Sequence, residues 1–123
     1  MEKGLTHTSR MEVKVENLAK SVGSGDLEVL ATPVMAALME NAAMLAVAES
    51  RPEGSTTVGS LLQITHNRPT ALGDTVEAVA VLEEVEGRKL TFSVQASDSK
   101  GVIGEGKHVR YVVDTQKFMA KLA

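Results

Sequence analysis

Glu40 is the first side chain in the sequence that could carry out chemistry. It lies in a long apolar run, TPVMAALMENAAMLAVAES over residues 32–50, and Asn41 is the only other polar residue between positions 33 and 48. A buried carboxylate is costly unless it is hydrogen-bonded or protonated. Glu40 is therefore either satisfied by a neighbour, such as Asn41, an arginine or a backbone N–H across an interface, or it acts as a general base or orients water or a nucleophile.

His66 and Thr32 are two further candidates for catalysis. His66 continues the apolar face of a predicted strand over residues 56–67, which ends just before Pro69. A histidine at this place is either a core side chain or an acid–base group at the mouth of a pocket. Thr32 precedes Pro33 at the start of the apolar run, which is typical of a helix N-cap, although its hydroxyl could also serve in catalysis.

Gly59 and Arg110 are candidates for binding rather than for chemistry. A glycine inside a predicted strand marks a bulge or a place where a ligand approaches the backbone. Arg110 shares a predicted strand face with His108, and it either pairs with an acidic neighbour or neutralises an anionic ligand. The sequence has three histidines without a metal-binding spacing and no cysteine, so we expect neither a metal site nor a disulfide.

A buried helix and five strands must position these residues. The run over residues 32–50 is apolar on every face, which predicts a core helix that is too short and too polar at its centre to span a membrane. Alternating patterns predict strands at residues 11–15, 56–67, 75–85, 88–97 and 102–113, and a short helix is expected at residues 117–122.

Two segments before the helix have no such pattern. Residues 1–10 are expected to be flexible. Residues 17–26 contain Gly23 and Gly25 and are expected to form a loop, either an ordinary connection or a mobile lid over Thr32.

Together these elements predict one α+β domain over residues 1–123, in which an antiparallel sheet curls around the helix. A single chain would leave one sheet edge and part of the apolar face open, which favours a homodimer joined edge to edge. The net charge of −3 and the lack of a basic run argue against nucleic acid as a partner. No apolar signal segment is found in residues 1–10, so a cytoplasmic protein without a membrane partner is expected.

Four segments carry a resemblance to a known family. TPVMAALMENAA, TVGSLLQITHNRPT, VEGRKLTFSVQASD and IGEGKHVR, in this order and spacing, resemble the hotdog-fold thioesterases, and within them the fluoroacetyl-CoA thioesterase-like group. The likeness spans residues 11–122. It implies a hotdog fold, a homodimer or tetramer with active sites at the subunit interface, and hydrolysis of a small acyl-CoA thioester. No cofactor is implied, because CoA is part of the substrate.

The resemblance also implies roles for individual residues. Thr32, Glu40 and His66 match the catalytic positions of the group, whereas Gly59 and Arg110 match positions that bind substrate. The segment SVGSGDLEVLA before the helix lacks an aromatic residue that could close over the acyl group, so fluoroacetyl specificity is not carried over. Two other classes remain open: a hotdog dehydratase or hydratase acting on acyl-CoA, and a non-catalytic acyl-CoA-binding module.

Overall fold

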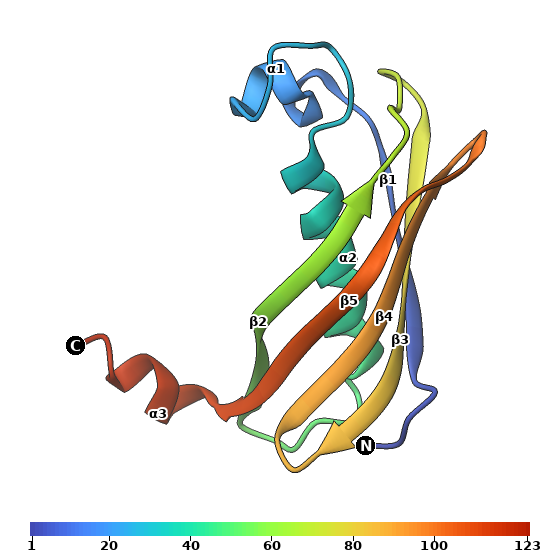
Figure 1. The fold of residues 1–123 in the computed structure, drawn as a ribbon. Helices are drawn as coiled ribbons and strands as arrows, with labels where there is room; N and C mark the ends of the chain where they lie inside the picture. Colours follow the sequence, from blue (N-terminus) through green and yellow to red (C-terminus); the bar gives the residue numbers. More distant parts are fainter.

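A computed structural model describes residues 1–123 and shows an antiparallel sheet wrapped around one long helix (Figure 1). The predicted α+β architecture is confirmed. The elements in chain order are β1 (Thr6–Glu12), the 3-10 helix η1 (Val15–Asn17), α1 (Ala19–Val22), α2 (Thr32–Ala46), β2 (Ser55–His66), β3 (Thr75–Glu86), β4 (Lys89–Asp98), β5 (Gly101–Asp114) and α3 (Thr115–Ala120).

Helix α2 packs mainly against β1, β3 and β4, through Met35, Met39, Ala42 and Ala43. Each of these side chains is fully buried, and burial of a side chain the size of Met is worth roughly 1.5–3 kcal/mol. The opposite face of α2 is open, because Thr32, Ala37, Asn41, Met44 and Leu45 are exposed. The expectation of a helix buried on every side is therefore wrong for the single chain.

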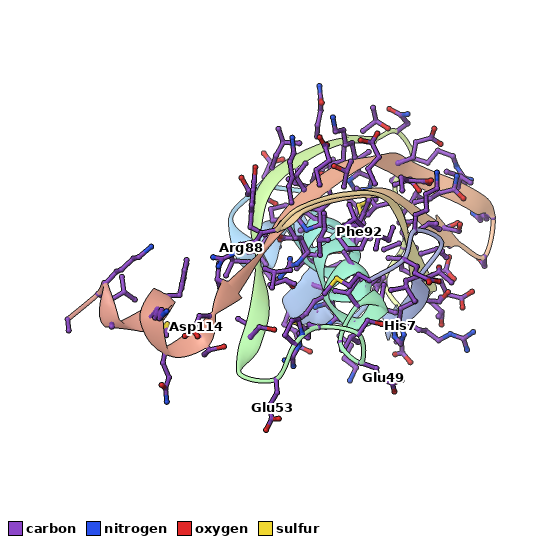
Figure 2. All side chains as sticks on the ribbon, turned by 90° about the horizontal axis from the view of Figure 1, so that it is seen from below. His7, Glu49, Glu53, Arg88, Phe92 and Asp114 are labelled. Atoms are coloured by element: carbon purple, nitrogen blue, oxygen red, sulfur yellow. The ribbon has the colours of Figure 1, made fainter.

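The sheet covers α2 with alternate residues of its central strands. The inward set of β3 and β4 is fully buried or nearly so: Val76, Ala78, Ala80, Leu82, Leu90, Phe92, Val94 and Ala96. Figure 2 shows the sheet curving over α2 with Phe92 on the inner side, while Glu49, Glu53 and Asp114 lie at the outer rim. This period of two explains why the sequence predicted these strands well.

The strand order is β1-β3-β4-β5-β2, so β1 and β2 form the two edges. β3, β4 and β5 follow one another as hairpins, but the chain after β2 crosses to the other side of the sheet instead of forming a hairpin. β2 pairs only with β5, and the register shifts between Gly59 and Leu61, which leaves Ser60 as a bulge. The outer edge of β2 is free.

The start of the chain differs from the prediction. Residues 6–10 were expected to be flexible, but they form most of β1 and pair with β3, from Thr6 opposite Val81 to Glu12 opposite Thr75. The segment over residues 17–26 is not a plain loop either, because it contains the single helical turn of α1, which ends at Gly23 in the left-handed conformation. No helix of the structure is long and apolar enough to cross a membrane.

Candidate functional site

Thr32 is the first residue of α2, and its hydroxyl faces the end of β2. Ala31 is the N-cap and no side chain caps the helix, so the prediction that Thr32 is the N-cap is wrong. Its Oγ1 instead lies 2.7 Å from Nδ1 of His66, across 34 residues of sequence. Pro33 in the first turn needs no hydrogen-bond acceptor, so the helix begins without using the threonine hydroxyl.

His66 is half-buried at the last position of β2. Burial lowers its pKa, and the backbone of Arg68 offsets this only in part. Nε2 is the one buried side-chain nitrogen or oxygen of the protein without a hydrogen-bond partner. A neutral imidazole that contacts a hydroxyl through Nδ1 can accept its proton, which is the arrangement of an activated nucleophile and its base.

A hollow of about 250 Å³ lies beside Thr32 and His66. Besides His66, small, aliphatic and polar side chains line it, with no Phe, Tyr or Trp: Ala19, Ser24, Val29, Leu30, Asn67, Arg68 and Pro69 complete the wall. The segment suggested as a lid therefore does reach the site, through Ala19 of α1 and Ser24.

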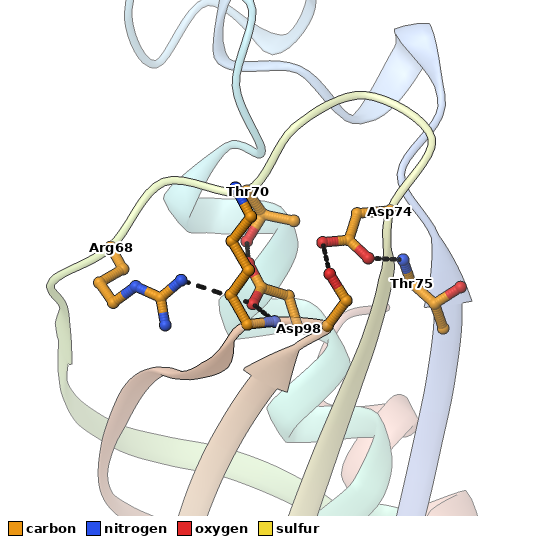
Figure 3. A network of polar contacts seen from close by, with 7 residues as sticks. Arg68, Thr70, Asp74, Thr75 and Asp98 are labelled. Carbon is orange, nitrogen blue, oxygen red and sulfur yellow. Dashed lines mark hydrogen bonds and ion pairs between the residues drawn. The ribbon is translucent and has the colours of Figure 1, made fainter.

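The wall formed by the loop after β2 is held by Asp98 at the end of β4 (Figure 3). Its side chain is 2% exposed and accepts hydrogen bonds from Thr70 Oγ1 and from the backbone N–H of Lys100, each at 2.8 Å. Arg68 lies 3.8 Å away. Burial raises the pKa of Asp98, but these hydrogen bonds and the charge of Arg68 outweigh that effect, so the pKa is lowered. Asp98 thus fixes the backbone next to His66 as an anion.

Glu40 lies farther along α2, half-buried and without a hydrogen bond or ion pair in the structure. Asn41 does not satisfy it, because Asn41 accepts a hydrogen bond from Ser9 of β1 at 2.6 Å. Oε2 of Glu40 lies instead over Gly59 of β2, where a Cβ atom added to the glycine would lie 2.8 Å from it. A glycine is therefore required there if the carboxylate is to keep its place, and within the single chain Glu40 has no hydrogen-bond or ion-pair partner.

Arg110 lies opposite Gly59 in the β2–β5 ladder and is almost fully buried. Its Nε donates to Thr57 Oγ1 and its Nη2 to the Thr57 carbonyl, each at 2.9 Å, and Nη1 lies 3.2 Å from Nε2 of His108. No carboxylate lies within ion-pair distance of it. Burial lowers the pKa of Arg110, and the charge of Glu40 raises it. A buried cation without a direct counter-ion is suited to receive a polar or anionic part of a ligand.

The structure thus brings the predicted residues together in two groups. The open half of the site consists of Thr32 and His66, and the buried half consists of Glu40, Gly59 and Arg110 with Thr57 and His108. Thr32 and Glu40 are eight residues apart on one helix, which separates them by roughly 12 Å along its axis. Within one chain the two halves do not meet.

Thr57 and His108 were not singled out from the sequence as site residues. The alternation of β5 places His108 on the face of Arg110, which was visible from spacing. Thr57 contacts Arg110 across 53 residues, and no local pattern reveals such a pairing. Gly104 and Gly106 pair with His66 and Ile64 in the ladder and allow the two strands to pack closely.

Comparison with known proteins identifies the family. The family described as fluoroacetyl-CoA-specific thioesterase matches residues 13–116. The fluoroacetyl-CoA thioesterase of Streptantibioticus cattleyicolor is 41% identical over 95 residues, which cover 77% of this chain and 68% of that protein.

Solved structures agree over almost the whole chain. The fluoroacetyl-CoA thioesterase FlK superposes with a TM-score of 0.92 at 34% identity, covering 99% of this chain and 95% of that one. A thioesterase superfamily member from Thermus thermophilus gives 0.91 at 25% identity, covering 98% and 90%. A hot-dog-like protein from Thermanaerovibrio acidaminovorans gives 0.89 at 24% identity, covering 99% and 90%, which supports the same fold. The chain has the hotdog fold and belongs to the fluoroacetyl-CoA-specific thioesterase family.

Proposed function

We propose that this acyl-CoA thioesterase hydrolyses the CoA thioesters of small acyl groups, at a site composed of the open half of one subunit and the buried half of its partner. The hydrolysis of acyl-CoA thioesters follows from the family. The proposal for the site is based on the contact of 2.7 Å between Thr32 Oγ1 and His66 Nδ1, and on Glu40, which has no partner in its own chain.

The catalytic roles follow from these contacts. The attacking oxygen, of water or of Thr32, must lose a proton as it forms a bond to the thioester carbonyl carbon. His66 Nδ1 is placed to accept a proton from Thr32, and Glu40 of the partner subunit accepts one from water. The C–S bond then breaks and CoA leaves as a thiolate, which needs no acid. If water attacks, the free acid forms directly. If Thr32 attacks, the acyl group stays on its oxygen as an ester until a water, whose proton Glu40 accepts, releases the acid and restores the hydroxyl. Arg110 and Gly59 bind the polar part of the substrate next to Glu40.

The free edge of β2 supports a dimer that would unite the two halves. β2 has no partner on its outer side, and Leu61 on this strand is 45% exposed. If β2 pairs antiparallel with its copy and the two-fold axis lies between Leu62 and Gln63, Gly59 of one subunit faces His66 of the other. Glu40 then lies near the Thr32–His66 pair of the partner, which a single chain cannot achieve.

Subunit complementation tests this arrangement. Glu40→Gln and His66→Ala dimers are each expected to be nearly inactive. After unfolding and refolding them together one to one, about half the dimers are mixed and each carries one intact site, so about a quarter of the wild-type rate returns. The matched control mixes Glu40→Gln with Arg110→Met, which both damage the buried half and give no recovery. Equal failure of both mixtures, or a monomer by light scattering, overturns the shared site but not the hydrolysis.

Acyl selectivity follows from the hollow beside Thr32. Its wall has no Phe, Tyr or Trp, and the segment that approaches it contributes only Ala19 and Ser24. We therefore expect little discrimination between fluoroacetyl-CoA and acetyl-CoA. Thiol release from fluoroacetyl-, acetyl-, butyryl- and benzoyl-CoA measures this, and a preference for fluoroacetyl-CoA over acetyl-CoA above a hundredfold contradicts it.

Acyl-CoA thioesters are intracellular metabolites, which supports a cytoplasmic location.

A further inference from the structure

His108 is fully buried on β5, and its two polar contacts fix the position of its proton. Nδ1 lies 2.7 Å from the carbonyl oxygen of Leu61. A carbonyl only accepts hydrogen bonds, so Nδ1 carries the proton. Nε2 lies 3.2 Å from Nη1 of Arg110, and a guanidinium only donates, so Nε2 must offer its lone pair. Both contacts are satisfied together only by the neutral imidazole protonated at Nδ1.

We propose that His108 is a positioning residue: as this neutral tautomer it accepts a hydrogen bond from Arg110 and holds the free N–H groups of the guanidinium at the space over Gly59. This inference rests on the proposed role of Arg110 in substrate binding. It adds a residue that acts through Arg110: its ring borders the same space only with Cε1, a carbon that supplies no strong hydrogen-bond donor or acceptor.

The donors of Arg110 show why this contact matters. A guanidinium has five N–H groups, and Thr57 takes one from Nε and one from Nη2. Both anchors lie on one side of the guanidinium, whereas Nη1 is held only by His108. Among the atoms of the guanidinium, Nη1 is also the one nearest to Gly59, 3.5 Å from where a Cβ would lie. His108 therefore takes one N–H of Nη1 and directs the other toward the space that Glu40 borders.

The surroundings of His108 keep it neutral. Burial lowers its pKa, and so does the charge of Arg110, while the hydrogen bond to Leu61 and the charge of Glu40 raise it; the net direction is downward. From β4, the ring of Phe92 lies tilted at 6.2 Å and brings no charge. Protonation would remove the lone pair at Nε2 and place two cations side by side, so the neutral form is the one that supports Arg110.

Two substitutions separate the two contacts of His108. His108→Asn places an amide N–H near the position of Nδ1, keeps the donor to Leu61 and loses the contact with Arg110. His108→Gln reaches the position of Nε2 with its carbonyl oxygen and keeps an acceptor for Arg110. We expect His108→Asn to lower kcat/KM roughly ten- to hundredfold, because a hydrogen bond to a charged group is lost. His108→Gln retains at least several-fold more activity than His108→Asn.

A double-mutant cycle shows whether His108 acts through Arg110. In the Arg110→Met background, His108→Asn is expected to lower kcat/KM by less than about twofold, since the group that it positions is absent. Additive losses in kcat/KM overturn the proposal. So does a higher kcat/KM for His108→Asn than for His108→Gln, or a loss of activity across the variants that follows the loss in melting temperature alone.

A spectroscopic measurement covers the case in which the variants do not fold. Imidazole ¹⁵N resonances of the wild-type protein are expected to show a protonated Nδ1 and an unprotonated Nε2 for His108 at neutral pH. The opposite tautomer or an imidazolium overturns the proposal. Because this readout needs no substrate, it stands apart from the proposed function, which fails separately if the wild-type protein releases no thiol from any acyl-CoA.

Discussion

The open and the buried half of the site are built on different principles. Thr32 and His66 lie at the ends of α2 and β2 and are joined by one hydrogen bond beside an open hollow. Arg110 lies in the middle of β5, and Thr57 and His108 hold it through three contacts. Arg110 is thus fixed before a ligand arrives, as electrostatic stabilisation requires. The open half can still adjust when substrate binds.

The largest effect is expected from removing the charge of Glu40, which has neither a hydrogen-bond nor an ion-pair partner. Glu40→Gln keeps the shape but cannot accept a proton, and loss of such assistance typically lowers kcat about 10²- to 10⁴-fold. The melting temperature is expected to stay near that of wild type, because Glu40 makes no hydrogen bond. Glu49→Gln, an exposed glutamate just after the same helix, is the control. Retention of more than a tenth of kcat would refute the role of Glu40.

The second-largest effect is expected from filling the space over Gly59 that Glu40 and His108 border. Gly59→Ala puts a methyl carbon 2.8 Å from Glu40 Oε2 and 3.3 Å from His108 Cε1, so the carboxylate must move. Misplacement of a reacting group by about 1 Å can cost up to about 10²-fold, and we expect kcat/KM to fall at least tenfold. We expect the melting temperature to fall only slightly, because the carboxylate is the free end of a flexible side chain and the buried His108 ring needs to shift by only a few tenths of an ångström. Unchanged kcat/KM would show that the space is not used.

The open half is expected to appear in the pH profile. Because burial lowers the pKa of His66 below its ordinary value of 6.5, the neutral base persists at neutral pH and is lost only as the pH falls through the lowered value. We expect kcat/KM to decrease about tenfold per pH unit below that value and to be level above 6.5. His7→Ala, which removes an exposed histidine of β1, keeps the same profile. An acid limb centred above pH 6.5 is incompatible with this assignment.

The smallest effect on catalysis is expected from the support of the open half. Asp98→Asn removes the anion that accepts from Thr70 and Lys100, and we expect a loss of about 1–3 kcal/mol in unfolding free energy with only a few-fold loss of activity. Because the pKa of Asp98 is lowered in the folded state, its stabilisation is complete above pH 3.8 and is lost as the pH falls through the lowered value. Chemical denaturation measures both, with exposed Asp26→Asn as the control. Equal stabilities of the two variants would contradict the anchoring role.

Much of the fold could be predicted from the sequence, because burial on one face leaves a period of two in β3 and β4. β1 was missed at its start because Thr6, His7, Thr8 and Arg10 are all exposed and only Ser9 points inward. Its strand structure comes from pairing with β3, which lies some seventy residues away in the chain.

The same limit applies to the site. Residue types and resemblance pointed to Thr32, Glu40 and His66. Local signals, however, predicted an N-cap for Thr32, since Thr before Pro at a helix start looks the same whether or not a histidine lies 34 residues further on. The partners that hold Arg110 become visible only when β2 and β5 are side by side.

The position of β2 at the edge also has a consequence for the order of folding. β3, β4 and β5 are joined by short turns, so their pairing closes small loops, whereas the contact of Thr57 with Arg110 closes a loop of 53 residues. Closing a longer loop costs more chain entropy and slows folding. We therefore expect β2 to dock onto a preformed hairpin sheet late in folding, so that the anchor of Arg110 and the edge available to a second subunit are created in the same step.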